Sequence, residues 1–195
     1  MTNVLTFKVE VKGLEDKIYR VIEITDSKTM ADLVYTILAT FDTLAYHLYE
    51  VVFNKKVYDS FLGEKEFRPK GAKDARKAYL NTFEFIKNDK MEMEYDFGST
   101  NEFFITYICK RPLEKGNGRH YPHIIEGNGR GIIDDISSFE LKEIVDDIDK
   151  LGYSKYYYTP GYERPIKYDY RDYDIKIDNI LLKGLIEEIK DGYEE

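Results

Sequence analysis

Two histidines and two adjacent aspartates form the set of residues in this chain with the most evident potential for metal chemistry. His120 and His123 are followed by Asp134 and Asp135, and imidazole and carboxylate groups together can bind a divalent ion. Pro122 lies between the histidines, so no regular helix can present both on one face. Zinc sites with four protein ligands usually contain a second close pair of Cys or His. We therefore interpret these histidines as exposed loop residues and predict neither a metal nor a cofactor.

The same stretch contains the tetrapeptide GNGR twice, at residues 116–119 and 127–130. Backbone N–H groups at Gly127, Gly129 and Gly131 could form a nest for a phosphate. However, no Walker lysine follows, and the acidic pair lies where the anion would bind. Turn-forming Asn-Gly pairs explain both copies more simply. We expect the first copy to be only a turn and the second a structural loop with polar anchors.

No nucleophile stands out. Cys109 lies in a predicted strand as a small apolar residue, and the chain has no Gly-x-Ser-x-Gly elbow. Residues 96–98 read DFG, but the other protein-kinase motifs are missing, so Gly98 is predicted to relax a hairpin turn. The sequence predicts no catalytic residue, although it leaves the question of an enzyme open.

The overall composition argues against some classes of binding partner. A formal charge of -8 and a pI near 5.1 make this an acidic protein, which argues against nonspecific coating of nucleic acid or of an anionic membrane. No apolar run of about 18 residues occurs, so we expect no membrane partner. The start of the chain lacks signal-peptide features and there is one cysteine, which predicts a cytoplasmic location. The sequence does not identify the binding partner, and we expect it to be a protein.

Nucleic acid stays an alternative partner on two segments. Residues 68–77 contain five basic residues and one acid, and residues 153–173 contain eight tyrosines with Arg164 and Arg171. Aromatic and basic side chains together can stack single-stranded bases. Acidic residues balance the charge of the second segment, so packing is the preferred interpretation there.

The elements that must position these residues follow from periodicity. Residues 4–12 and 17–25 alternate as half-buried strands, and Arg20 falls on the core-facing side of the second strand, where its charge needs a partner. Residues 30–41 have helical spacing with Thr29 as N-cap, and residues 47–58 read as strand, turn and strand. This order predicts a β-grasp, or ubiquitin-like, ββαββ unit.

The remainder predicts an extension of that unit. Residues 61–76 form a polar loop, and residues 90–97 and 102–113 form a hairpin. Helices are expected at 139–150, capped by Ser138, and at 177–190, with an irregular tyrosine-rich segment between them. The predicted fold is α+β with a mostly antiparallel sheet. We expect one domain over residues 1–195, composed of a β-grasp-like half (1–60), an extension (61–150) and a tyrosine-rich wrap with the last helix (151–195).

Several ordered motifs resemble the plasmid pRiA4b ORF-3-like family. Residues 18–22 (IYRVI), 29–33 (TMADL) and 47–51 (HLYEV) correspond to family motifs IWRRI, TLxxL and HLYxF. Residues 95–103 (YDFGSTNEF) correspond to YDFGDxWxH, with the second acid, the tryptophan and the histidine replaced. Further on, Tyr121-Pro122, the second Gly-x-Gly and the acidic pair match in order. The resemblance covers residues 4–150, with a weaker echo in Tyr173-Asp174 and the last helix.

The family has no established reaction, and its members include passenger proteins of mobile elements. Because part of the acid and histidine motif is replaced here, the resemblance implies a non-enzymatic binding or interaction module linked to mobile elements. The alternatives are a metal-assisted hydrolase or nuclease, which would use aspartates and a histidine, and a nucleic-acid-binding protein. The candidate polar site, which we expect to form one buried network, consists of Arg20, His47, Tyr95, Asp96, Asp134 and Asp135.

Overall fold

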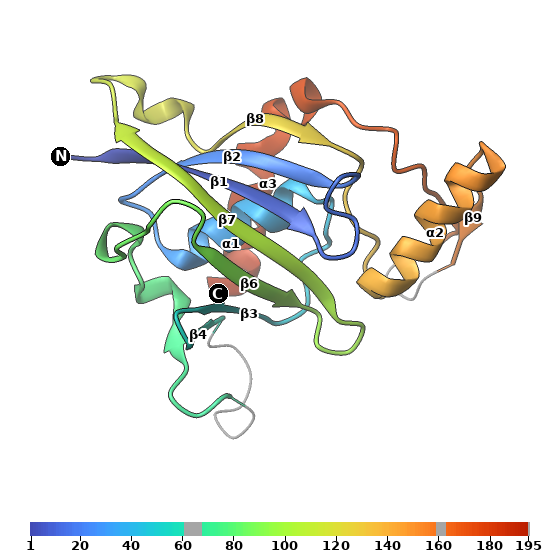
Figure 1. Cartoon of the computed structure of the whole chain (residues 1–195), viewed down its shortest axis with the longest axis horizontal. Helices are drawn as coiled ribbons and strands as arrows, with labels where there is room; N and C mark the ends of the chain where they lie inside the picture. The colour runs from blue at the N-terminus through green and yellow to red at the C-terminus, as the bar shows by residue number, and fades with distance from the viewer. Residues whose placement is uncertain (61–67, 159–162, 195) are drawn as a thin grey trace.

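A computed structural model describes residues 1–60, 68–158 and 163–194. Strands and helices follow one another as β1 (Asn3–Val11), β2 (Tyr19–Thr25), α1 (Met30–Thr40), β3 (Tyr49–Phe53), β4 (Lys56–Asp59), β5 (Lys73–Asp74), β6 (Lys90–Tyr95), β7 (Asn101–Pro112), β8 (His123–Asn128), α2 (Ser138–Leu151), β9 (Tyr156–Tyr157), β10 (Ile166–Lys167) and α3 (Ile175–Glu194). The predicted α+β class with a mostly antiparallel sheet is confirmed (Figure 1).

The main sheet has eight strands in the order β5-β4-β3-β6-β7-β1-β2-β8. Among the strand pairs of the described residues, only β4–β5 is parallel. The β-grasp detail is not confirmed, because the β6–β7 hairpin lies between β1 and β3 and pairs with both. The two N-terminal hairpins are thus parts of a longer sheet.

Helix α1 is buried along its whole length between the sheet and α3. Thr29 and Asp32 form the capping box at its start: the Thr29 hydroxyl accepts from the Asp32 N–H, and the Asp32 carboxylate accepts from the Thr29 N–H at 2.8 Å. A helix that is apolar on most sides is stable only when it is covered on most sides. Figure 1 shows α1 and α3 behind the sheet, so α3 supplies the second cover.

Helix α3 is longer than predicted and ends in the core. Leu182, Ile189 and Tyr193 form its buried side, and the Tyr193 ring packs on Tyr35 and Tyr49 at centroid distances of 5.5 and 5.3 Å. None of the helices in the described parts of the chain combines the length and the apolar character needed to cross a membrane.

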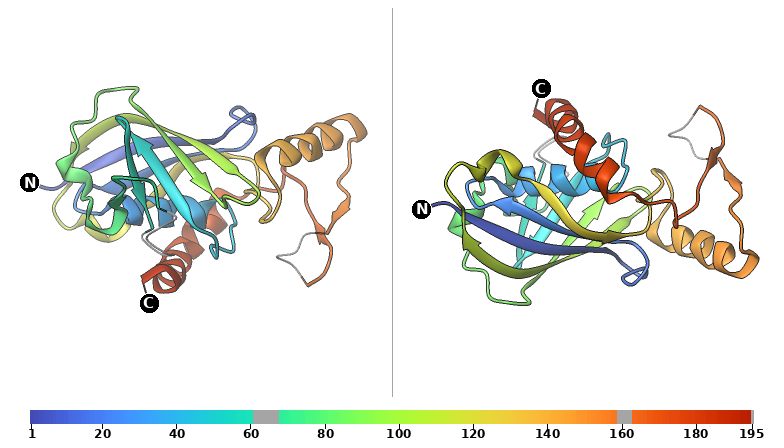
Figure 2. Two further views of the ribbon diagram at one scale, coloured as in Figure 1. Left: turned by 90° about the horizontal axis from the view of Figure 1, so that it is seen from below. Right: turned by 90° about the horizontal axis from the view of Figure 1, so that it is seen from above.

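Helix α2 projects from one end of the sheet together with β9 and β10 (Figure 2). Its N-cap is Ser137 rather than the predicted Ser138, and Ser137 forms a capping box with Glu140. The tyrosine-rich segment contains the short β9–β10 pair, and the predicted 61–76 loop lies partly outside the described residues.

Residues 116–135 were expected to be a loop, but they contain a strand. Strand β8 pairs with β2 in an antiparallel register, with Arg20 opposite Gly127. This strand was missed because it is at the sheet edge, where only Ile124 is fully buried, so it lacks the alternation of a half-buried strand.

Candidate functional site

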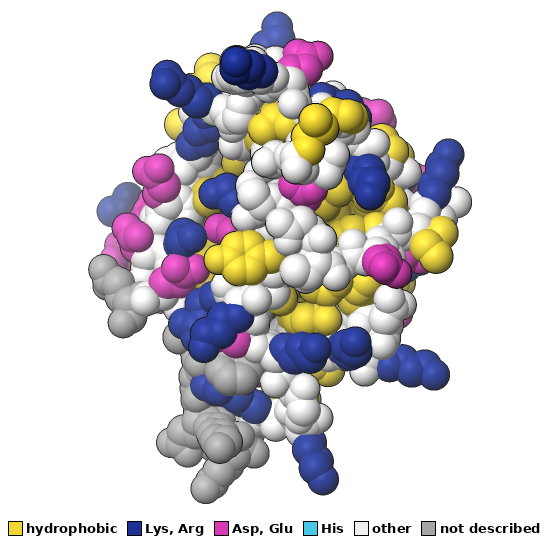
Figure 3. Space-filling view, turned by 90° about the vertical axis from the view of Figure 1, so that its left-hand side faces the viewer, with side chains coloured by type: hydrophobic (Ala, Val, Ile, Leu, Met, Phe, Trp, Pro, Cys, Tyr) yellow, Lys and Arg dark blue, Asp and Glu magenta, His cyan; other side chains and the backbone are white. Residues whose placement is uncertain are grey.

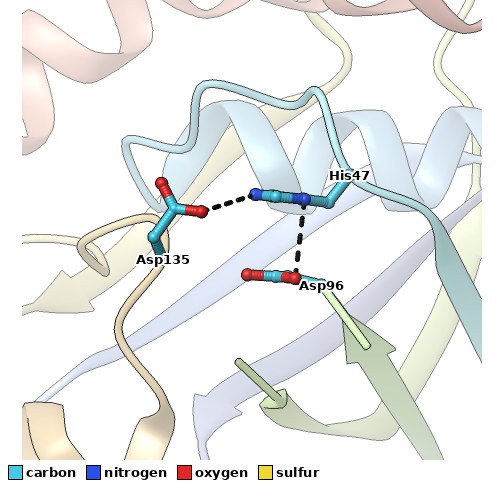
Figure 4. A group of neighbouring side chains, drawn as sticks. All are labelled: His47, Asp96 and Asp135. Carbon is cyan, nitrogen blue, oxygen red and sulfur yellow. Dashed lines mark ion pairs between the residues drawn. The ribbon is translucent and has the colours of Figure 1, made fainter. Parts of the chain in front are cut away.

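Three loops place one histidine and two aspartates together (Figure 4). His47 lies between α1 and β3, Asp96 directly follows β6, and Asp135 lies between β8 and α2. The His47 Nδ1 is 3.5 Å from Asp96 Oδ1, and the Nε2 is 3.2 Å from Asp135 Oδ1. One donor atom from each residue lies within 4.8 Å of the others. We call these three residues the His47 cluster.

The backbone at both aspartates is left-handed. Asp96 has φ 60° and Asp135 has φ 61°, a region that aspartate enters more readily than most residues because its side chain bonds the local backbone. At Asp96 this bond is made by Oδ1, which accepts from the Gly98 N–H at 3.1 Å. The local turns therefore point both carboxylates toward the imidazole.

Backbone hydrogen bonds hold the three loops to one another. The Asp96 N–H donates to Leu48 O at 3.0 Å, and the Ser138 N–H donates to Thr100 O at 3.3 Å. The Ser138 hydroxyl in turn accepts from the Glu102 N–H at 3.0 Å. The positions of the cluster side chains are thus fixed by the fold, as a preorganised site requires.

Asp134, the neighbour of the cluster, has a structural role. Its side chain is fully buried, and its two oxygens accept hydrogen bonds from the Tyr95 hydroxyl at 2.7 Å and the Leu44 N–H at 2.8 Å. Burial raises the pKa of Asp134, and burial together with this carboxylate raises the pKa of Tyr95 far above its usual value. Tyr95 and Asp134 therefore connect the sheet to two of the loops.

Two atoms of the cluster lack hydrogen-bond partners. Asp96 Oδ2 is buried without a partner, on a side chain that is only 6% exposed. His47 Nε2 also has no hydrogen bond, although Asp135 lies 3.2 Å away. Figure 4 shows that the free Asp96 oxygen points to the Asp135 side of the cluster. Because a buried carboxylate oxygen without a partner is costly, this atom indicates a place for a ligand.

The donor set fits a divalent ion that accepts mixed nitrogen and oxygen ligands. Donors about 2.1 Å from a tetrahedral ion lie roughly 3.4 Å from one another. The 3.5 and 3.2 Å distances at His47 run to different ring nitrogens, and with one donor atom from each residue the three atoms lie within 4.8 Å of one another. One ion would use only one ring nitrogen. Three protein ligands leave at least one coordination position open.

Tyr46 covers the cluster from the solvent side, and the sequence did not point to it. Its hydroxyl donates to Asp135 Oδ2 at 2.5 Å, and its ring centroid is 4.0 Å from that of His47. Burial, followed by the Asp135 hydrogen bond, raises its pKa. Its position next to His47 was the one signal that could have identified it.

Arg20 does not join these residues, which corrects the expectation of one network. Its Nε donates to Thr40 O, and its Nη1 donates to the carbonyls of Asn128 and Gly129, at 2.8–3.0 Å. The guanidinium lies 3.8 Å from the Tyr173 ring centroid. Arg20 is on the β8 side of its strand, so it connects α1 to the β8 loop rather than to the cluster.

The metal set built from His120 and His123 is not formed. His120 is in a short 3-10 helix and His123 begins β8, both exposed. Among the described residues, the one group of three or more potential ligands is the His47 cluster. Spacing along the chain thus suggested histidines that the fold places elsewhere.

The second GNGR copy is packed against backbone rather than open to an anion. A Cβ at Gly129 would lie 2.2 Å from Lys17 O, and one at Gly131 would lie 2.0 Å from Phe41 O. Arg130 pairs with Asp42 at 3.2 Å. These glycines allow close approach of two chain segments, and the structural interpretation of this loop fits that packing.

Several basic residues of the two candidate nucleic-acid segments are in ion pairs. Arg76 and Lys77 both pair with Asp74, and Arg171 pairs with Asp169. Figure 3 shows lysines and arginines scattered around the end of the sheet where β1 starts, with hydrophobic side chains between them. A hollow of about 320 Å³ beside the start of β1 is lined by Phe83, Phe85, Tyr107 and other residues.

Comparisons with known proteins identify relatives but no activity. The sequence model of the family described as plasmid pRiA4b ORF-3-like protein matches residues 3–177. The fold is similar to the crystal structure of a protein of unknown function from Methanosarcina mazei Go1, with a TM-score of 0.70 and 21% identity, covering 90% of this chain and 96% of that one. The chain matches no curated protein.

Proposed function

This chain belongs to the plasmid pRiA4b ORF-3-like protein family, and we propose that it is a non-enzymatic binding module whose His47 cluster binds a divalent cation. The observation that carries the proposal is the buried, unpartnered Asp96 Oδ2 within a set of three donor atoms that lie within 4.8 Å of one another. A cation there supplies the missing partner and joins three loops through their side chains.

The ligand types favour Zn²⁺ or Mn²⁺ over Mg²⁺ and Ca²⁺. Imidazole suits the transition ions, whereas Mg²⁺ and Ca²⁺ take oxygen ligands almost exclusively. The ion is accessible, because the side chains of His47 and Asp135 are 22% and 17% exposed. An open coordination position at an accessible ion can take a donor group from a partner protein.

Binding is favoured over hydrolysis by the surroundings of Asp135. This residue lines a surface groove of about 650 Å³ whose other acidic residues are Glu140, Glu143, Asp146 and Asp147. Lysines pair with two of these acids, Lys17 and Lys142 with Asp146 and Lys155 with Asp147. The remaining negative charge of the groove repels ligands of the same sign, which disfavours phosphodiester substrates and hence a nuclease. Asp134 is occupied by Tyr95 and Leu44, so it is not a free general base.

The biological context and the cellular location are proposed from the family description and from the cysteine content. The plasmid in the family description supports a role in protein interactions linked to mobile elements. The single cysteine, Cys109, is an exposed free thiol, which suits a reducing cytoplasm. Nucleic-acid binding is the weaker alternative, because Arg76, Lys77 and Arg171 are in ion pairs and the formal net charge is -8.

The test is calorimetric titration of the chelator-treated full chain with ZnCl₂, MnCl₂ and MgCl₂. We expect one site per chain for Zn²⁺ or Mn²⁺ and much weaker binding of Mg²⁺. At a free ion concentration of about 100 times Kd, the free energy of unfolding should rise by about 2.7 kcal/mol. Asp96→Asn and His47→Gln should each remove the heat and the stabilisation, whereas the exposed control Asp172→Asn should keep both.

Two results would contradict the proposal. Absence of heat with all three ions would refute the cation site, and so would binding that persists in both cluster variants. Hydrolysis of a phosphodiester in the presence of Mn²⁺ or Zn²⁺, lost in Asp96→Asn, would replace the binding module by the hydrolase alternative.

A further inference from the structure

Helix α3 carries a second apolar face opposite its buried side. Ile177, Ile180, Leu181 and Leu185 are 54, 79, 53 and 37% exposed. A Cβ added at Gly184, on the same face, would meet no atom within 4 Å. We call these five residues the α3 stripe. A run of exposed aliphatic side chains at helical spacing is typical of a helix that packs on a further partner.

The stripe continues into the loop before β3. Leu185 lines a groove of about 770 Å³ together with Leu44, Tyr46 and Ile189, and Leu44 and Tyr46 are 45% and 52% exposed. The apolar surface therefore extends from the helix across the adjoining loop.

Charges beside the stripe indicate what covers it. Lys176 and Glu187 are separated by eleven residues, which is three helical turns plus about 20°, so both lie on the same flank of α3. Neither has an ion-pair partner within the described residues. Lys176 is five residues before Leu181 and Glu187 is six residues after it, so the two charges are nearly equidistant from Leu181.

We propose that the α3 stripe is the interface of a homodimer, in which α3 packs antiparallel against α3 of a second copy around a two-fold axis near Leu181. Antiparallel helices related by such an axis bring equivalent flanks together. Ile177 then faces Leu185 of the second copy, Leu181 faces Leu181, and Ile180 faces Gly184. Lys176 of each copy meets Glu187 of the other, so the same surface is complementary to itself in shape and charge.

Sedimentation velocity over a range of concentrations tests the apolar part. We expect the wild type to dimerise and Leu181→Glu to raise the dimer dissociation constant by about tenfold or more. The matched control is Ile86→Glu, an exposed isoleucine in the turn before β6 that is 72% exposed; it should dimerise as the wild type does. A wild type that stays monomeric, or a dimer that is unaffected by Leu181→Glu, would overturn the proposal.

Charge reversal tests the antiparallel arrangement of the two α3 helices. It also keeps the dimer proposal testable if the Leu181→Glu variant fails to fold. Lys176→Glu and Glu187→Lys should each weaken the dimer by about three- to tenfold, and the double variant should recover the wild-type value. An equimolar mixture of the two single variants should prefer the heterodimer, because both of its charge pairs are then complementary. A double variant as weak as the singles would exclude this antiparallel arrangement.

Discussion

The structure contains two groups of charged residues within or next to the core, and they differ in how fully their polar atoms are satisfied. Arg20 is 1% exposed and donates to four backbone carbonyls, those of Tyr19, Thr40, Asn128 and Gly129. In the His47 cluster, Asp96 is almost as buried, yet its Oδ2 has no partner. No Arg20 nitrogen is a buried polar atom without a partner, whereas Asp96 Oδ2 is.

The difference separates a structural role from a binding role. The Arg20 guanidinium lies between the rings of Tyr173 and Phe41, at centroid distances of 3.8 and 4.9 Å, and Asp178 Oδ2 is 3.9 Å from its Nε. Burial lowers the pKa of Arg20 and raises the pKa of Tyr173 to about 12. Removing the partners of a buried charge is costly, whereas the incomplete set of partners at Asp96 is what the proposed cation would complete.

The largest expected loss of stability is that of the Arg20→Met variant. The variant leaves four carbonyls without their donor and removes the ring contacts, so we expect a loss of about 3–5 kcal/mol in the free energy of unfolding. Urea denaturation measures this loss. Arg171→Met is the matched control, because Arg171 pairs with Asp169 at the surface, and it should cost less than about 1 kcal/mol. Equal losses in the two variants would show that the Arg20 contacts add little.

The second largest loss of stability is expected in the loop whose Gly129 carbonyl accepts a hydrogen bond from Arg20. Gly129 has φ 73°, and an added Cβ would lie 2.2 Å from Lys17 O. Gly129→Ala should therefore cost about 3 kcal/mol. Gly116 has φ 89° with open space around it, so Gly116→Ala should cost about 1 kcal/mol.

Thermal or chemical denaturation of both glycine variants makes this comparison. A loss at Gly116 that matches the loss at Gly129 would mean that left-handed strain, rather than close packing, decides the cost.

Local sequence patterns predicted most helices and strands, whereas the order of the strands in the sheet depends on tertiary pairing. The 30–41 helix and its Thr29 cap follow from spacing and capping chemistry. The position of β6 and β7 between β1 and β3 joins residues about 40 or more apart in the chain, and no local pattern encodes that pairing. The β-grasp expectation failed to be confirmed for this reason.

The same limit applies to the candidate site. Residue type and motif order selected His47, Asp96 and Asp135, and the fold places one donor atom of each within 4.8 Å of the others. They also selected Arg20, which is 1% exposed but bonds Thr40 and the end of β8 instead of the cluster, because burial alone does not say which partners a charge finds. Tyr46 was missed because its one signal, its position next to His47, does not show that its hydroxyl reaches Asp135.

The smallest effect, and the one that sharpens the comparison most, is on Asp178→Asn. Arg20 is satisfied mainly by carbonyls and rings, and the pKa of Asp178 is raised by its own burial. The substitution should therefore lower the free energy of unfolding by about 1 kcal/mol or less.

The effect should also depend on pH. A carboxyl group whose pKa is higher in the folded than in the unfolded chain stabilises the fold most below its ordinary pKa of 3.8, and this stabilisation declines as the pH rises through the raised value. Because asparagine does not titrate, the stability difference between wild type and variant should shrink from about pH 4 to about pH 7. Urea denaturation across that range measures it, and a difference that widens with pH would show that the 3.9 Å pair with Arg20, and not the carbonyls, satisfies the buried charge.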